Sequence, residues 1–150
     1  MQTAKQLSVS LVNKPGRLAD VLVALNKGKV NFRALAVMDT GQRGTIRFVP
    51  DDCKKAEHIL DDINVDYESA EVLLVDVSPQ SGGFQKICER LADEHLTIDY
   101  AYCSYDHGGK SKGGGKAVIR VNDRGKAKRV LGGNGASRKK LPYRRALLTR

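Results

Sequence analysis

The sequence predicts an α+β fold built from two β-α-β-β-α-β units, each an antiparallel sheet with helices on one face. Three observations lead to this prediction. The chain repeats itself 66 residues on, because LSVSLVNKPGRL (7–18) aligns without a gap with LLVDVSPQSGGF (73–84). In both copies an alternating apolar run leads through a glycine-containing turn into apolar residues at helical spacing. Segments rich in β-branched residues then follow in the same order.

The first copy contains every element of one unit. After the opening strand, apolar residues recur at i, i+3, i+4 and i+7 and predict a helix. The segments VNFRALAVM (30–38) and GTIRFV (44–49) have the pattern of a second and a third strand. Pro50-Asp51-Asp52 provides the chemistry of a second helix start. NVDYES (64–69) predicts a short fourth strand. This unit has the ferredoxin-like topology.

The second copy repeats these elements except the last. Its first helix is followed by the predicted strands LTIDYAYCSY (96–105) and KAVIRV (116–121), and Asn122-Asp123 begin a last helix. Beyond that helix the alternation is lost, so the second unit has no predicted fourth strand. The expected domains are 1–69 and 70–132, followed by a basic tail at 133–150. A flexible end, a basic anchor and an altered terminus stay open as explanations of that tail.

The two halves are expected to pair, either packed together or joined edge to edge. A unit of about 66 residues buries only a thin core and leaves much of its sheet exposed. The opening strand of the second half is apolar on both faces, through VLLVDV (72–77). We therefore expect contact between the halves, and a further pairing of chains into a homodimer.

Composition and charge exclude several classes of protein. The chain is 41% hydrophobic and has no apolar run near the about 20 residues of a membrane span, nor a signal peptide, so a cytoplasmic location is expected. Its cysteines, Cys53, Cys88 and Cys103, are odd in number and indicate reduced thiols. The formal charge of +9 comes from the end of the chain, because residues 1–123 hold 16 basic and 17 acidic side chains. Net charge therefore says little about the main function.

Two units with a glycine at the first strand-to-helix turn resemble the ACT domain, a regulatory module that binds amino acids and similar small effectors. The segment VNKPGRLADVLVALNKGKVNF (12–32) carries the resemblance through its Pro-Gly-x-Leu turn, its amphipathic helix and the Val-Asn that follows. The resemblance covers about residues 5–131. It implies a non-enzymatic regulatory protein without cofactors, which binds an amino acid or related effector. The candidate partner is a regulated enzyme of amino-acid biosynthesis or a transcriptional system.

The opening turns are the candidate ligand sites. Pro15 suits the first positions of a helix, Gly16 lets a ligand come close, and the free N–H groups at the helix start would hold a carboxylate. The resemblance places the ligand at this turn, between paired units, against a polar residue that begins the second strand. The residues expected to bind ligand are Asn13, Pro15, Gly16, Arg17, Leu18 and Asn31 in the first unit, and Gly82, Gly83, Phe84 and Thr97 in the second.

Whether a chain has one site or two stays open. In the second unit Ser81 stands where the first has Pro15, and Thr97 has a shorter reach than Asn31. Ordinary turn chemistry also explains the first turn without a ligand, with glycine supplying a positive φ and proline a fixed one.

Other motifs do not support catalysis or metal binding. HGGKSKGGGK (107–116) lacks the spacing of a phosphate loop and precedes a strand, so it predicts a hairpin connection. Cys103 and His107 have the spacing of half a metal site, without a second pair. His58 and His95 lie in predicted helices without a recognisable catalytic pattern. No catalytic residue and no metal ligand is therefore expected.

Two alternative functions stay open. The runner-up is a nucleic-acid-binding ferredoxin-like protein that acts through its basic C-terminal tail. The aromatic third strand of RNA-recognition folds is absent from KAVIRV, so packing between the halves explains Tyr100, Tyr102 and Tyr105 better than base stacking. A small enzyme is the third alternative.

Overall fold

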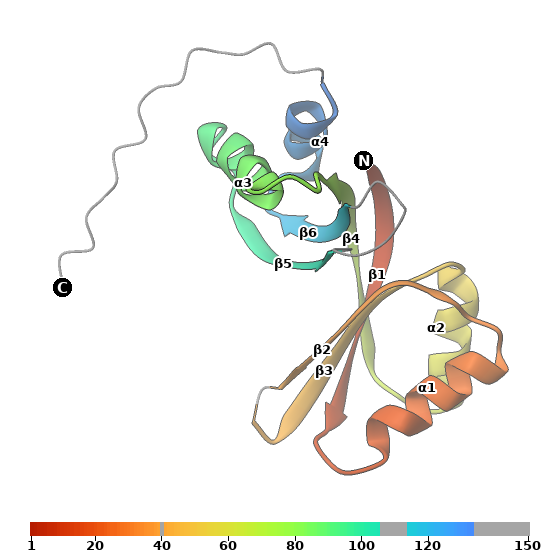
Figure 1. The fold of residues 1–150 in the computed structure, drawn as a ribbon. Coiled ribbons are helices and arrows are strands. Elements are labelled where there is room, and N and C mark those ends of the chain that lie inside the picture. The colour runs from red at the N-terminus through yellow and green to blue at the C-terminus, as the bar shows by residue number, and fades with distance from the viewer. Residues whose placement is uncertain (40, 106–113, 134–150) are drawn as a thin grey trace.

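The computed structural model describes residues 1–39, 41–105 and 114–133, which form one six-stranded antiparallel sheet and four helices (Figure 1). The strand order is β2-β3-β1-β4-β6-β5. The predicted α+β fold with βαββαβ-like units is confirmed. The elements are β1 (Gln2–Val12), α1 (Arg17–Lys27), β2 (Phe32–Asp39), β3 (Arg43–Pro50), α2 (Cys53–Asp62), β4 (Tyr67–Val77), α3 (Gly83–Asp93), β5 (Ile98–Tyr105), β6 (Gly115–Val121) and α4 (Arg124–Gly132).

Strand β4 joins the two halves. The sequence suggests a short strand at the end of the first unit and a separate strand at the start of the second, but Tyr67–Val77 is one continuous strand. It pairs with β1 from Tyr67 to Leu74 and with β6 from Leu73 to Val77. No glycine or proline interrupts these residues, so nothing in the local chemistry ends the pairing. The boundary expected between residues 69 and 70 falls inside β4.

The first residues of β1 fill the place for which the sequence provides no strand in the second unit. The first unit has the order β2-β3-β1-β4, and the second has the matching order β5-β6-β4-β1. Thr3 pairs with Leu73 and Ala4 with Val72, so β1 lies beside β4 as a fourth strand would. Because residues 2–6 are mostly polar, their pattern does not predict a strand that begins before Leu7. The basic tail at 134–150 lies outside the described residues.

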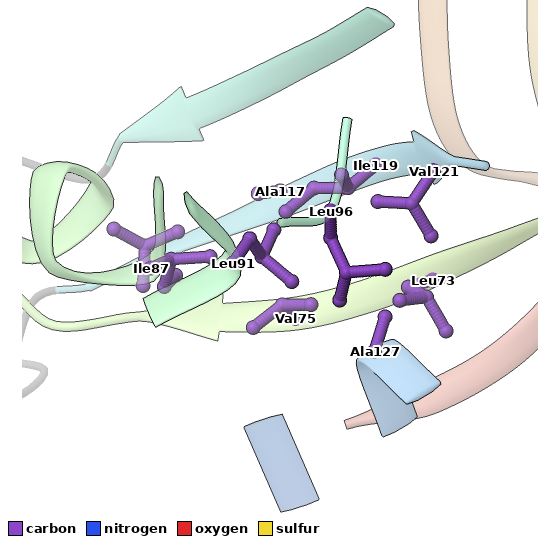
Figure 2. Close-up of a cluster of buried hydrophobic side chains, with 10 residues drawn as sticks. Leu73, Val75, Ile87, Leu91, Leu96, Ala117, Ile119, Val121 and Ala127 are labelled. Atoms are coloured by element: carbon purple, nitrogen blue, oxygen red, sulfur yellow. The ribbon is translucent and has the colours of Figure 1, made fainter. Parts of the chain in front are cut away.

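Each helix pair covers its own part of one face of a twisted sheet (Figure 1). Helices α1 and α2 close a core with Leu7, Val9 and Phe48, whereas α3 and α4 close a second core around Leu73 and Ile119. Figure 2 shows this second core, with Val75 of β4 beside Ile87 and Leu91 of α3, and Leu73 of β4 beside Ala127 of α4. Within the described residues no helix is long and apolar enough to cross a membrane.

The opposite face of the sheet carries no helix but still buries side chains from both halves. Val49 of the first half packs in one cluster with Val72, Leu74 and Val118. Tyr102 of β5 packs against the same cluster, although the three strands β1, β4 and β6 separate β5 from β3 in the sheet order. The sheet is therefore curved, and its helix-free face is concave.

Candidate functional site

The turn between β1 and α1 is exposed and open. Gly16 precedes the helix with a φ of 86°, in the left-handed region that glycine adopts without strain. A Cβ atom placed on Gly16 would meet nothing within 4 Å. Within the described residues, no side chain caps the start of α1. The N–H groups of the first turn and the positive end of the helix dipole are thus accessible to a small anion.

Neighbouring residues fix this turn to the rest of the unit. The backbone N–H of Asn13 donates to the carbonyl oxygen of Gln42 at 2.9 Å, and its side-chain Nδ2 donates to that of Gly41 at 3.4 Å. The Leu18 side chain packs against the first core. Asn13, Pro15 and Arg17 are exposed, so they are predicted site residues with side chains at the surface of the turn.

Asn31 lies at the other end of α1 from Gly16. The helix has 11 residues, which corresponds to roughly 16 Å. The Nδ2 atom of Asn31 donates to Asp51 Oδ2 at 3.0 Å, and its backbone N–H donates to Asp51 Oδ1 at 3.1 Å. These two hydrogen bonds, the side-chain one first, lower the pKa of Asp51 below its ordinary value. Asn31 therefore links the start of β2 to the end of β3, and it does not lie near Gly16.

The second turn has the same backbone conformation but tighter packing. Gly82 precedes α3 with a φ of 80°. A Cβ atom on Gly83 would lie 2.5 Å from the carbonyl oxygen of Ser78, so close packing alone explains that glycine. Phe84 packs against the second core. Thr97 lies beyond the end of α3, where its backbone N–H donates to Asn122 Oδ1 at 3.1 Å.

The two turns lie at opposite ends of the sheet. Strands β1 and β4 run antiparallel, with Val9 opposite Tyr67 and Gln2 opposite Leu74. The turn of the first unit follows Val12, whereas that of the second follows Val77, and roughly 40 Å of strand separates these levels. Gly16 and Gly82 are therefore not brought together within one chain. A ligand shared by two turns would need a second copy of the chain.

The environments of Cys53 and Cys88 do not favour a nucleophile. Burial and, second to it, the contact with Glu57 together raise the pKa of the Cys53 thiol to about 11. Burial also raises the pKa of Cys88. A nucleophilic cysteine needs the opposite shift. No group of three His, Cys, Asp or Glu side chains in the described residues could hold a metal ion. His107, which has the spacing of half a metal site with Cys103, lies outside the described residues.

Tyr100 and Tyr102 of β5 contact the first half of the chain, as predicted from the sequence. The hydroxyl of Tyr102 donates to Gln6 Oε1 at 2.9 Å, and Gln6 Nε2 donates to the hydroxyl of Tyr100. The guanidinium of Arg47 stacks on the ring of Tyr100, with Cζ 3.8 Å from the ring centroid. The side chain of Tyr105 lies outside the described part.

Sequence patterns did not single out Gln6, Ser8 or Arg47. The available signal is the alternation of Ser8 and Ser10 with the apolar residues of β1, and of Arg47 with Ile46 and Phe48 of β3. Such alternation also marks an ordinary solvated sheet face. The curvature that brings Tyr100 over this face is not a property of either strand alone.

The fold and the two glycine turns define a tandem ferredoxin-like protein whose units share their central strands. The family model of the ACT domain pair matches residues 2–137, and the chain belongs to this family. A protein of Bacteroides thetaiotaomicron is similar in structure, with a TM-score of 0.78 and 29% sequence identity over 87% of each chain.

Two further solved structures share the fold at low sequence identity. The ligand-free regulatory subunit of aspartate kinase from Thermus thermophilus has a TM-score of 0.61 and 15% identity, over 88% of this chain and 96% of that one. The corresponding subunit from Thermus flavus has a TM-score of 0.61 and 14% identity, over 88% and 90% of the two chains. No curated protein matches this sequence.

Proposed function

We propose that this chain is a non-catalytic regulatory protein that binds an amino acid or a related small effector. Membership of the ACT domain pair family supports this proposal, and the fold shared with regulatory subunits of aspartate kinase supports a regulatory role. The observation on which it depends most is the open turn at Gly16, where an uncapped helix start faces unfilled space. A regulated enzyme is the proposed partner.

The proposed first site consists of the turn residues Asn13 to Leu18. The effector carboxylate would accept hydrogen bonds from the first N–H groups of α1, with the exposed Arg17 nearby. The second turn, with Gly82, Gly83 and Phe84, is the proposed second site. Because Asn31 and Thr97 lie at the far ends of their helices, they would reach a ligand at a turn only from another copy. Binding would then stabilise one arrangement of the copies over another.

We further propose a homodimer formed through edge strand β2 of the sheet. Strand β2 has one neighbour, β3, and its Leu35 and Val37 side chains are 41% and 54% exposed. An exposed apolar edge strand invites pairing with another chain. Val37→Lys should therefore shift the protein toward monomer in sedimentation velocity, whereas Val23→Lys, at a 51% exposed valine on α1, should not. A monomeric wild-type protein, or equal effects of both changes, would contradict this interface.

A thermal-shift screen of the twenty amino acids tests the function. A ligand that binds only the folded protein stabilises it by about 2.7 kcal/mol at a concentration a hundred times its Kd. Gly16→Val should remove the part of the shift that arises at this turn, because the side chain fills the turn and its branched Cβ opposes a φ of 86°. Gly82→Val introduces the same backbone conflict at the other turn and should keep the part of the shift that arises at Gly16. No shift at millimolar concentrations of any amino acid would count against the proposal.

The nucleic-acid alternative depends on the basic tail. That segment lies outside the described residues, and no specific observation in the described part favours this function.

A further inference from the structure

A polar hollow of about 600 Å³ lies on the concave, helix-free face of the sheet. Its floor comes from β1, β3 and β4 of the first half, with Ser8, Arg47 and Glu68 among the lining residues. Tyr100 of β5 and Arg120 of β6 reach it from the second half. It is separate from the turn at Gly16, and its size is in the range of sites for small molecules, about 300 to 1,000 Å³.

The register of the sheet places opposite charges on the two sides of a serine. Ser8 of β1 lies opposite Arg47 on β3 and opposite Glu68 on β4. Because neighbouring strands are about 4.8 Å apart, the Cα atoms of Arg47 and Glu68 are separated by roughly 10 Å. Two residues along, on the same face, Ser10 lies opposite Thr45. The hollow thus offers a cation, several hydroxyl groups and a carboxylate in one strip.

Arg47 is held in place but keeps an unused donor. Its guanidinium stacks on the Tyr100 ring, which fixes the plane of its N–H groups. Its Nε atom is buried and has no hydrogen-bond partner among residues 1–39, 41–105 and 114–133. Arg47 lines the hollow, so an anionic oxygen bound there would accept hydrogen bonds from the terminal N–H groups of the guanidinium and not from the covered Nε. In the described structure Arg47 and Glu68 form no ion pair with each other across the hollow.

A buried hydrogen-bond network positions the wall of the hollow. Gln6 has no exposed surface, and its amide holds the hydroxyls of Tyr100 and Tyr102 at the same time. Burial raises the pKa of Tyr102, so this hydroxyl remains a donor at physiological pH. The Tyr100 ring is thus fixed from its hydroxyl by Gln6 and from its face by Arg47. Such support from a second layer of residues is what a precise binding site needs.

We propose that this hollow binds a small zwitterion, with its carboxylate on Arg47 and its ammonium group on Glu68. Arg120 and Asp66 add one more charge of each sign, so the lining is formally neutral, which disfavours polyanions. The inference deepens the proposed function, and it rests on that function for the expectation that the zwitterion is an effector. The location is independent of the strand-to-helix turns.

An NMR titration of the ¹⁵N-labelled full chain tests the site. The probes are the twenty L-amino acids, with propionate and butylamine as the matching carboxylate and amine alone. Amides of Ser8, Thr45 and Glu68 should shift with a bound amino acid. Arg47→Gln should lower the affinity for amino acids and for propionate about ten- to a hundredfold, because it removes a charge-assisted hydrogen bond. Glu68→Gln should lower the affinity for amino acids but leave the affinity for propionate unchanged, because propionate has no ammonium group.

Arg33→Gln is the matched control, because Arg33 is an exposed arginine of β2 outside the hollow, and it should leave all affinities unchanged. Shifts confined to Lys14–Leu18 and insensitive to Arg47→Gln would overturn this site while leaving the proposed function intact. Absence of binding by every probe would overturn both. If Arg47→Gln does not fold, Glu68→Gln decides, since unchanged affinity for amino acids in that variant would refute the assignment.

Discussion

Replacing Leu73 by alanine should lower the free energy of unfolding by about 2 to 5 kcal/mol, as for other fully buried leucines. Leu73 has no exposed surface and lies in the core under α3 and α4 (Figure 2). It also pairs with Thr3 on β1 and with Ile119 on β6, so few neighbours can move to fill the cavity. Urea unfolding followed by far-UV circular dichroism measures the loss.

Ile63→Ala is the matched control for this change. The same number of carbon atoms is removed, but Ile63 is 38% exposed at the C-terminal end of α2, so its loss should cost under about 1 kcal/mol. Leu7→Ala, in the core under α1 and α2, should lower the same single transition as Leu73→Ala, because β1 and β4 belong to both units. Two separate transitions in either variant would contradict this coupling.

Replacing Gly83 by alanine should destabilise the protein by about 1 to 3 kcal/mol, because the new methyl group overpacks the turn. Its Cβ would lie 2.5 Å from the oxygen and 3.1 Å from the nitrogen of Ser78, and backbone atoms cannot move aside as a flexible side chain can. The start of α3 would therefore have to shift away from the end of β4. Thermal unfolding followed by circular dichroism measures the effect.

Gly125→Ala provides the comparison for Gly83→Ala. Gly125 occupies the first turn of α4, and its added Cβ would make an ordinary contact of 3.6 Å with Asp123 Oδ1. Alanine is the better helix former, so this change should leave stability unchanged or raise it by up to about 1 kcal/mol. Equal stability of the Gly83→Ala and Gly125→Ala variants would show that the approach to Ser78 is not tight.

The elements of the fold could be predicted because their signals are local. The β-branched residues of β3 and β6, the helical spacing in α1 and α3, and the Asp52 and Asp123 caps all act within a few residues. The continuity of β4 could not be predicted in this way. Whether residues 67–77 are one strand or two depends on partners from β1 and β6, which lie far away in sequence.

The candidate sites likewise combine features that depend on local sequence with features that depend on distant partners. The left-handed conformations of Gly16 and Gly82 follow from the turn sequences and are present. The hydrogen bond from Asn31 to Asp51 depends on how β3 ends beside β2, and the resemblance to the ACT domain did not indicate this pairing. The stack of Arg47 on Tyr100 joins residues 53 positions apart through the curvature of the whole sheet.

The sharing of β1 and β4 limits how the protein can change shape. A hinge needs a short segment that absorbs rotation, and two unbroken strands running side by side through both halves leave no such segment between them. Each half therefore turns only as far as the common sheet bends. Effector binding would then reach a regulated enzyme through a change in sheet curvature or through a change in how whole chains dock. A change in curvature would directly alter the geometry of the concave face.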